Sequence, residues 1–234
     1  MPSKLLLIML RDGNDVSYIT QVGTGNYNER TSKLYTDLTL MTADRDFGSD
    51  ASVVFNALAV GNTVESTNKL LVAPKGLKSR IVELIDNEIT YKDKGYIGIK
   101  MNSLTDKDII EKLAEASRAG VKIELVVRGI CCLIAGVEGD TENIRVISIV
   151  GRFLEHSRIY IFGTGDRRRG YISRADFMTR NTERRVEVAA PLLDKSIADR
   201  AVEIFETMLR DNVKAREQDS DGNYYHVQPK EGEP

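Results

Sequence analysis

The stretch that decides the fold runs from residue 144 to residue 181 and reads IRVISIVGRFLEHSRIYIFGTGDRRRGYISRADFMTRN. It predicts three short strands, at residues 144–149, 158–162 and 171–173. His156 stands two positions before Arg158, at the start of the second of these strands. Alternate residues of a strand point to one face of a sheet, so this histidine and this cation are expected side by side.

The residues after the third strand extend this candidate site. Asp176 and Asn181 follow the strand and could be carried to the same end of the sheet. A nucleophilic or acid–base imidazole ringed by guanidinium groups such as that of Arg158 suits phosphoryl chemistry, because fixed positive charge stabilises the equatorial oxygens. A single His-x-Arg is far more often ordinary surface or core chemistry. The pattern therefore depends on support from the rest of the chain.

Composition limits the class of protein. The chain has 234 residues, of which 41% are hydrophobic and 29% charged, as in ordinary soluble globular proteins. A formal net charge of −2 does not indicate a nucleic acid partner, and no apolar run approaches the length of a membrane span. The two cysteines, Cys131 and Cys132, are adjacent, which favours a reducing cytoplasm. With two histidines and no Cys-x-x-Cys, we expect no metal ligands in the chain.

Strands and helices alternate over most of the sequence, which predicts an α/β sheet with helices on both faces. The amphipathic segments predict helices at residues 44–60, 76–89, 105–119 and 195–210. The further expected strands are residues 36–40, 70–73, 96–101, 121–127 and 185–189, and a small hairpin is expected around 223–227. The polar stretch 61–68 is the candidate linker, and it divides the chain into residues 1–68 and 69–234.

The amino-terminal segment predicts a hairpin. Residues 5–10 are apolar and indicate a buried strand, and the polar residues 11–15 indicate a turn into a second strand at 16–19. The segment lacks the small-residue cleavage site of a signal peptide. A domain that opens directly on a core strand is expected to belong to something longer.

The chain contains a weak internal repeat. Residues 23–58 align without a gap on residues 173–208, with a turn, a strand and an amphipathic helix in the same order. The aligned pairs include Asn26 with Asp176, Arg30 with Arg180, Asp37 with Glu187 and Asp44 with Asp194. Extending the repeat upstream, with a gap for the Arg-rich turn, places Pro2 on His156. The repeat thus predicts a histidine at position 2, where this chain has proline.

Two halves with His-x-Lys/Arg and a Gly/Ser-rich turn carrying Asn or Asp resemble the phospholipase D superfamily. Longer blocks are similar to the C-terminal half of bacterial polyphosphate kinase: GTGNYN (23–28), LYTDL (34–38), KMNSL (100–104), VRGICCL (127–133), SIVGRFLEHSR (148–158), SRADFMTRN (173–181) and DNVKA (211–215). The resemblance runs from Ser3 to about Val227. It implies a mixed α/β fold with one complete phospholipase-D-like lobe, residues 69–234, preceded by the end of another, residues 1–68.

This resemblance implies a kinase that moves the terminal phosphoryl group between ATP (or ADP) and inorganic polyphosphate through a phosphohistidine. It implies ATP contacts at Tyr35 and Arg128. It makes His156 an acid–base group facing the phosphates. We expect Asp176 and Asn181 to orient this imidazole through hydrogen bonds.

The phosphorylated histidine of that family belongs where this chain has Pro2, so we expect the isolated chain to be inactive. The magnesium ligands and the rest of the adenine pocket are expected upstream, in a full-length homo-oligomer. Residues 167–169, three arginines, are expected to flank the phosphate channel. His226, in the tail, is expected to be structural or disordered.

Two other functions stay open at the level of sequence. The first is a phosphodiesterase of the phospholipase D type, with His156 paired to its counterpart across a dimer. The second is a non-catalytic module that binds nucleotide or polyphosphate. Activity on a diester would identify the first, and binding without turnover would identify the second.

Overall fold

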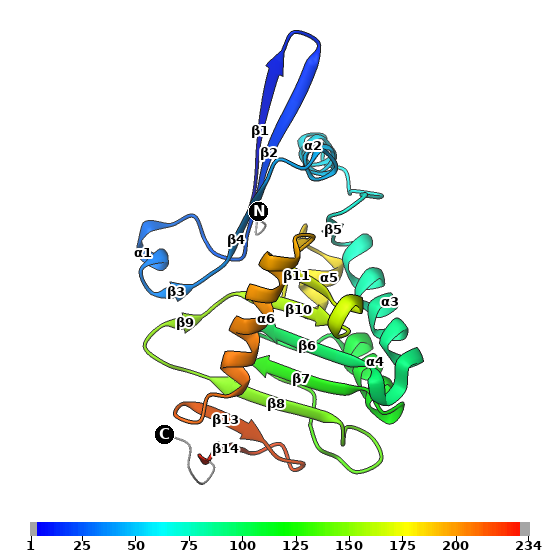
Figure 1. The fold of residues 1–234 in the computed structure, drawn as a ribbon, viewed down its shortest axis with the longest axis vertical. Coiled ribbons are helices and arrows are strands. Elements are labelled where there is room, and N and C mark those ends of the chain that lie inside the picture. The colour runs from blue at the N-terminus through cyan, green and yellow to red at the C-terminus, as the bar shows by residue number, and fades with distance from the viewer. Residues whose placement is uncertain (1–3, 230–234) are drawn as a thin grey trace.

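The computed structural model describes residues 4–229, and its centre is a nine-stranded mixed sheet (Figure 1). The strand order is β14-β13-β8-β7-β6-β10-β11-β12-β5. These strands are β5 (Leu71–Val72), β6 (Tyr96–Met101), β7 (Lys122–Val127), β8 (Ile144–Ile149), β10 (Arg158–Phe162), β11 (Arg169–Ser173), β12 (Val188–Pro191), β13 (Ala215–Gln218) and β14 (Tyr224–His226). The central strands β6, β7 and β8 are parallel, and the other pairs are antiparallel. The carboxyl ends of the three parallel strands therefore meet at one edge.

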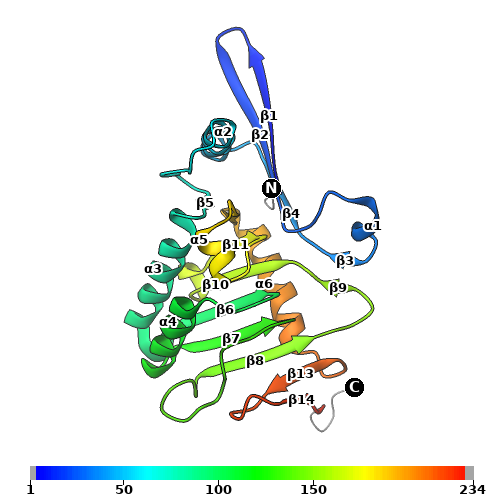
Figure 2. The ribbon, with the colours of Figure 1, turned by 180° about the vertical axis from the view of Figure 1, so that it is seen from behind.

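Helices cover both faces of this sheet, as Figures 1 and 2 show from opposite sides. Helices α3 (Gly76–Tyr91) and α4 (Lys107–Arg118) pack on one face, and α6 (Lys195–Leu209) packs on the other. Successive residues of β7 alternate between the two cores, because Leu125 joins the core with α3 and α4 while Val126 joins the core with α6. The predicted fold class, a mixed α/β sheet with helices on both faces, is confirmed.

A second, three-stranded sheet is formed by the amino-terminal part. Strand β1 (Lys4–Asp12) pairs with β2 (Asp15–Gly23), which also pairs with β4 (Thr39–Thr42). The predicted hairpin is confirmed, but its first strand is not buried. Leu6, Ile8 and Leu10 are 38%, 43% and 52% exposed. An apolar run fills a core only where other elements cover it, and within residues 4–229 only β2 pairs with β1.

The internal repeat is present in three dimensions. Helix α2 (Arg45–Ala59) begins after the cap residue Asp44, and α6 begins after Asp194, its partner in the aligned sequence. The short helices α1 (Glu29–Ser32) and α5 (Thr179–Glu183) also correspond. Strands β2 and β4 pair as β11 and β12 do. The two halves are copies of one supersecondary unit.

Two short strands join the halves near their turns. Strand β3 (Tyr35–Thr36) pairs in parallel with β9 (Leu154–Glu155), although the two are far apart in sequence. This pairing carries the residues after β3 to the residues after β9. Two 3₁₀ turns, η1 (Lys92–Lys94) and η2 (Gly165–Arg167), close the connections at the opposite end of the sheet.

The predicted linker is held in one conformation by a buried carboxylate. Asp50 of α2 accepts hydrogen bonds from the backbone N–H groups of Asn68, Lys69 and Leu70, at 2.8, 2.7 and 2.9 Å. Its side chain is almost fully buried. A buried carboxylate keeps its charge only where such donors replace water. Asp50 therefore ties the first half to the entrance of β5.

We expect Asp50→Ala to lower the free energy of unfolding by about 3 kcal/mol, because three backbone donors lose their acceptor. Asp50→Asn keeps one acceptor oxygen and should cost less. Urea unfolding followed by circular dichroism measures both. The control is Asp46→Ala on the same helix, at an exposed carboxylate 3.8 Å from the Lys69 ammonium. Equal losses for Asp46→Ala and Asp50→Ala would contradict this account.

Candidate functional site

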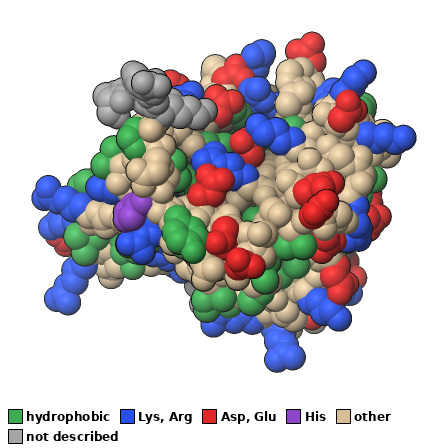
Figure 3. Space-filling model, turned by 90° about the horizontal axis from the view of Figure 1, so that it is seen from below, with side chains coloured by type: hydrophobic (Ala, Val, Ile, Leu, Met, Phe, Trp, Pro, Cys, Tyr) green, Lys and Arg blue, Asp and Glu red, His purple; other side chains and the backbone are tan. Residues whose placement is uncertain are grey.

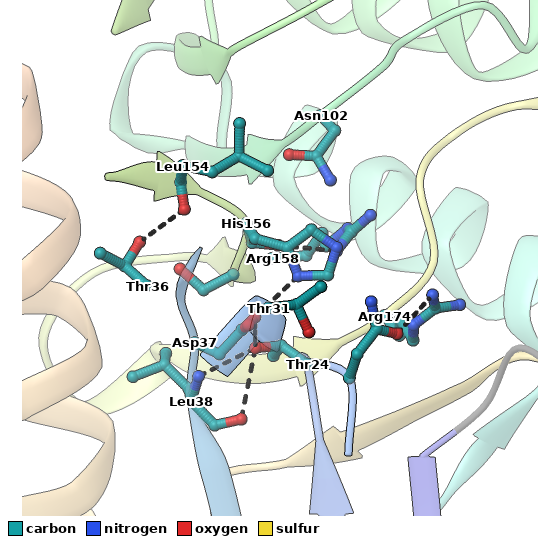
Figure 4. Close-up of polar contacts among 12 residues, drawn as sticks. Thr24, Thr31, Thr36, Asp37, Leu38, Asn102, Leu154, His156, Arg158 and Arg174 are labelled. Atoms are coloured by element: carbon teal, nitrogen blue, oxygen red, sulfur yellow. Dashed lines mark hydrogen bonds and ion pairs between the residues drawn. The ribbon is translucent and has the colours of Figure 1, made fainter. Parts of the chain in front are cut away.

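A buried ion pair forms the centre of the candidate site, and its arginine, Arg158, lies against His156 in Figure 4. Arg158, the first residue of β10, donates from Nε and Nη2 to the two carboxylate oxygens of Asp176, at 3.1 and 3.0 Å. Asp176 also accepts from the backbone N–H groups of Asn102 and Ser103, which follow β6. The pair therefore joins the ends of β6, β10 and β11 at the carboxyl edge of the parallel strands, where ligand sites of such sheets lie.

The imidazole of His156 is held between an acid and a cation. Nδ1 lies 2.8 Å from Oδ1 of Asp37, and Nε2 lies 3.1 Å from Nη1 of Arg158. A carboxylate only accepts and a guanidinium only donates, so the two contacts select the neutral tautomer that carries its proton on Nδ1. The lone pair of Nε2 then faces the positive charge. This is the protonation state of a general base or nucleophile.

The orientation of His156 differs from the expectation. Asp176 contacts Arg158 and not the imidazole, and Asn181 lies in α5 with its Oδ1 buried and without a hydrogen-bond partner among the described residues. The carboxylate that orients the ring is Asp37, which β3 brings across from the first half. The prediction that Asp176 and Asn181 hydrogen-bond His156 was wrong, because a second-half partner was expected where the first half supplies one.

The two residues predicted to contact ATP lie beside this centre. The ring of Tyr35 packs on the imidazole of His156, with centroids 4.8 Å apart. Arg128, directly after β7, donates from Nε to the side-chain oxygen of Asn102 at 3.1 Å. Burial and the neighbouring charge of Arg158 lower the pKa of Arg128. The structure thus brings Tyr35, Arg128 and His156 to one edge of the sheet, while their roles stay predictions.

Lys100 is a member of the site that the sequence did not single out. It belongs to β6, is buried, and donates from Nζ to the carbonyl and hydroxyl oxygens of Ser157 at 2.7 and 2.9 Å. Burial lowers its pKa to about 8, against the attraction of the Glu155 carboxylate, which lies 3.7 Å away. The sequence shows a lysine inside an apolar strand. Only the fold shows that its ammonium group binds Ser157, the residue after His156.

The arginine loop does not flank this site. In the pairing of β10 with β11, Arg158 lies opposite Ser173, whereas Arg169 lies opposite Phe162 at the other end. The guanidinium of Arg167 lies over the ring of Tyr91, with its carbon 3.7 Å from the centroid. The expectation that residues 167–169 flank a phosphate channel was wrong, because the length of β10 separates this loop from the edge of the sheet that holds His156.

The repeat partner of Asp37 is Glu187, whose surroundings differ from those of Asp37. Glu187 is fully buried, and neither carboxylate oxygen has a hydrogen bond within residues 4–229. Burial raises its pKa, against the attraction of Arg174. Arg174 in turn donates to the side-chain oxygen of Asn26, the repeat partner of Asp176. The pseudo-symmetric half-site thus holds the carboxylate but, among the described residues, no imidazole.

No metal centre is formed by the described residues. In the range 4–229, no group of three or more His, Cys, Asp or Glu side chains could hold a metal ion. The expectation of magnesium ligands upstream stays a prediction. No helix of the same range is long and apolar enough to cross a membrane.

Comparison with known proteins follows the same division of the chain. The family model described as Polyphosphate kinase C-terminal domain 2 matches residues 70–234, and the model described as Polyphosphate kinase C-terminal domain 1 matches residues 1–64. The chain belongs to the polyphosphate kinase family. The polyphosphate kinase of Bacillus cereus is 49% identical over 228 residues, which are 96% of this chain and 32% of that protein.

Solved structures agree with this assignment. Polyphosphate kinase from Porphyromonas gingivalis matches with a TM-score of 0.91 and 39% identity, over 100% of this chain and 37% of that chain. A yeast tyrosyl-DNA phosphodiesterase matches with a TM-score of 0.50 and 8% identity, over 81% of this chain and 65% of that one. The second likeness shows the fold alone. The chain spans about a third of the length of the polyphosphate kinases it matches.

We expect Asp37→Asn to reduce the population of the Nδ1–H tautomer of His156, because the substitution removes the charged acceptor at that nitrogen. Nitrogen NMR of labelled imidazole distinguishes the tautomers. Asp199→Asn, at an exposed carboxylate paired with Lys195, is the matched control and should leave the signals unchanged. A native chain with its proton mainly on Nε2 would contradict the assignment.

We expect the affinity of the unliganded site for a short oligophosphate to fall as the pH rises through about 8. The pKa of Lys100 is lowered to that value, so its positive charge is present below it and lost above it. Lys100→Gln should lower the affinity below pH 8 and flatten the profile. Isothermal titration calorimetry between pH 6 and pH 9 measures both. A native profile that matches that of Lys100→Gln would exclude this role.

Proposed function

We propose that this chain supplies the second half of a polyphosphate kinase active site. In the longer protein, the terminal phosphoryl group of ATP would be transferred reversibly to inorganic polyphosphate through a phosphohistidine. The observation that carries the proposal is the imidazole of His156, fixed between Asp37 and Arg158 at the carboxyl edge of the sheet. The family membership of the chain supports the choice of substrates.

The protonation state of His156 suits proton exchange with a phosphoryl group. The electron pair on Nε2 can accept a proton when it gives up the hydrogen bond from Arg158, and Asp37 stabilises the imidazolium that results. Arg158 holds the ring from the other side and donates also to its backbone carbonyl, at 2.6 Å. Protonation of Nε2 ends its hydrogen bond with Arg158, whereas Asp37 accepts from Nδ1 in both protonation states and keeps the ring in place.

Three cations lie at the same edge of the sheet as this imidazole, and their charge can stabilise phosphate oxygens. Arg158 and Arg128 are joined through Asp176 and Asn102, and Lys100 lies on the strand between them. Fixed positive charge in a site shielded from water stabilises the charge that spreads over a phosphoryl group in flight. Tyr35, packed on the imidazole, would contact the nucleotide as the family resemblance implies.

Glu187 supports the location of the missing nucleophile. It is the repeat partner of Asp37, it is buried, and its oxygens have no hydrogen bond in the described part of the chain. By the symmetry of the two halves, its carboxylate would accept the Nδ1–H of a histidine from the first half. The family pattern and the repeat put that histidine at the position of Pro2, which lies outside the described residues.

The remaining expectations concern the longer protein. Magnesium would be bound by upstream residues and would neutralise phosphate charge. A homo-oligomer and a cytoplasmic location stay predictions, and the proposed chemistry of His156 depends on neither.

We expect the 234-residue chain to take up no acid-labile label from ATP labelled at the γ-phosphate, because the in-line nucleophile is absent. Added to an upstream portion of a related kinase that carries the histidine, it should support labelling of that portion. His156→Gln and Glu187→Gln should each reduce this labelling by about a hundredfold or more.

The control is Glu183→Gln, at an exposed carboxylate that pairs with Lys78, and it should leave labelling unchanged. Acid-labile label on the chain alone would overturn the proposal and make His156 the phosphoacceptor. Hydrolysis of a phosphodiester by the chain would favour the phosphodiesterase alternative instead.

A further inference from the structure

A groove of about 560 Å³ lies next to the candidate site, on the side of the central sheet where β13 and β14 are. It is formed where β8 ends and the β13–β14 hairpin covers the sheet edge. The residues that line it include Gly129, Ser148, Lys214, Arg216, Tyr224 and His226. Figure 3, which views the molecule from this end, shows a histidine beside Lys and Arg side chains on the surface. His226, expected to be structural or disordered, is the last residue of β14 and is exposed.

The charges of the groove all have one sign. Its lining includes Lys214 and Arg216 and no aspartate or glutamate. Neither cation forms a salt bridge within residues 4–229, although the charge of Lys214 acts on the nearby carboxylate of Asp211, and Arg216 lies 3.5 Å from Nε2 of His226. The chain as a whole has a net charge of −2, so two cations in a hollow whose lining has no acidic side chain are a local excess.

The two cations of the groove belong to one stretch of chain, with Lys214 directly before β13 and Arg216 within it. Arg216 is opposite Ser148 of β8 on one side and opposite His226 of β14 on the other. The stem of Lys214 lies along Gly151, where there is no side chain to displace it. Two cations along one strand, with an imidazole on the next strand, present an extended set of polar groups that suits a linear polyanion better than a compact one.

The groove and the candidate site are connected through Arg128 and the residue that follows it. Gly129, which lines it, is the residue after Arg128, and the hydroxyl of Ser148 donates to the carbonyl of Arg128 at 3.1 Å. In the strand order, β10 with Arg158 is followed by β6, β7, β8, β13 and β14. The distance from Arg158 to His226 is thus five strand spacings, or about 24 Å.

We propose that this groove, here named the Lys214–Arg216 groove, binds the inorganic phosphate chain of polyphosphate outside the reacting end. This inference rests on the proposed function. The chain would pass from His156 over Arg128 to Lys214, Arg216 and His226, which donate to its non-bridging oxygens. Long polyphosphate would then bind more tightly than a short oligophosphate, which reaches only the site at His156.

The test is titration of the 234-residue chain with tripolyphosphate and with long-chain polyphosphate over a range of salt concentrations. The double substitution Lys214→Gln/Arg216→Gln should weaken long-chain binding about tenfold. It should also reduce the slope of log affinity against log salt by about 1.5. Binding of tripolyphosphate should be unchanged. The matched control is Lys94→Gln/Arg200→Gln, which removes two exposed cations outside the groove.

The outcomes separate the two proposals. Tight tripolyphosphate binding with no added affinity for the long chain would overturn the groove and leave the proposed function standing. No binding of either phosphate would overturn both. Equal weakening by the groove and control variants would show a general charge effect and overturn the groove. Equal weakening of single-stranded RNA binding by the groove variant would show a general polyanion surface and overturn its assignment to polyphosphate.

Discussion

The ion pair between Arg158 and Asp176 is the interaction on which the site depends. Both side chains are buried, and burial of two charges costs more than their attraction returns unless the remaining hydrogen-bonding groups are satisfied. Here the backbone of Asn102 and Ser103 donates to Asp176, while Arg158 donates also to the carbonyl and ring of His156. The pair is therefore part of a connected network, and its main consequence is position. The planar guanidinium group of Arg158 fixes the positions of three strand ends and one imidazole.

The network also explains why the site combines the two halves of the chain. Its acid, Asp37, comes from the first half, and its imidazole and guanidinium come from the second. The first half of the duplicated unit thus completes the site of the second. Asp37 is engaged and Glu187, its counterpart, is not, so the symmetry is present in the backbone and in the carboxylates but not in the histidines.

Much of the fold could be predicted from the sequence, because in the helices and the central strands the apolar residues recur at the positions that are buried. The helix predicted at 195–210 and the strand predicted at 96–101 correspond to Lys195–Leu209 and Tyr96–Met101. The exposure of β1 could not be predicted, because its residues are apolar and only the partners of a strand decide whether it is covered. The position of residues 167–169 depends on the register of β10 with β11, which the sequence does not encode locally.

The main residues of the site could be predicted from one stretch of sequence, but the contacts between them could not. His156, Arg158 and Asp176 lie within a few residues of one another, so strand alternation was enough to group them. The contact of His156 with Asp37 joins residues 119 positions apart and needs the parallel pairing of β3 with β9. Lys100 is similar, because a lysine inside an apolar strand indicates a buried charge without indicating its partner.

The topology of the sheet accounts for the gathering of charge on a chain that is acidic overall. Strands β6, β7 and β8 are parallel, so the residues that follow them emerge at one edge, and β10 begins at the same edge because it runs antiparallel to β6. Arg128 and Arg158 are therefore neighbours as a consequence of strand direction. Continuing in the same order, β13 and β14 carry Arg216 and His226 to the next positions. The cations of the Lys214–Arg216 groove therefore lie on the same side of the sheet order as Arg128, with β8 between them.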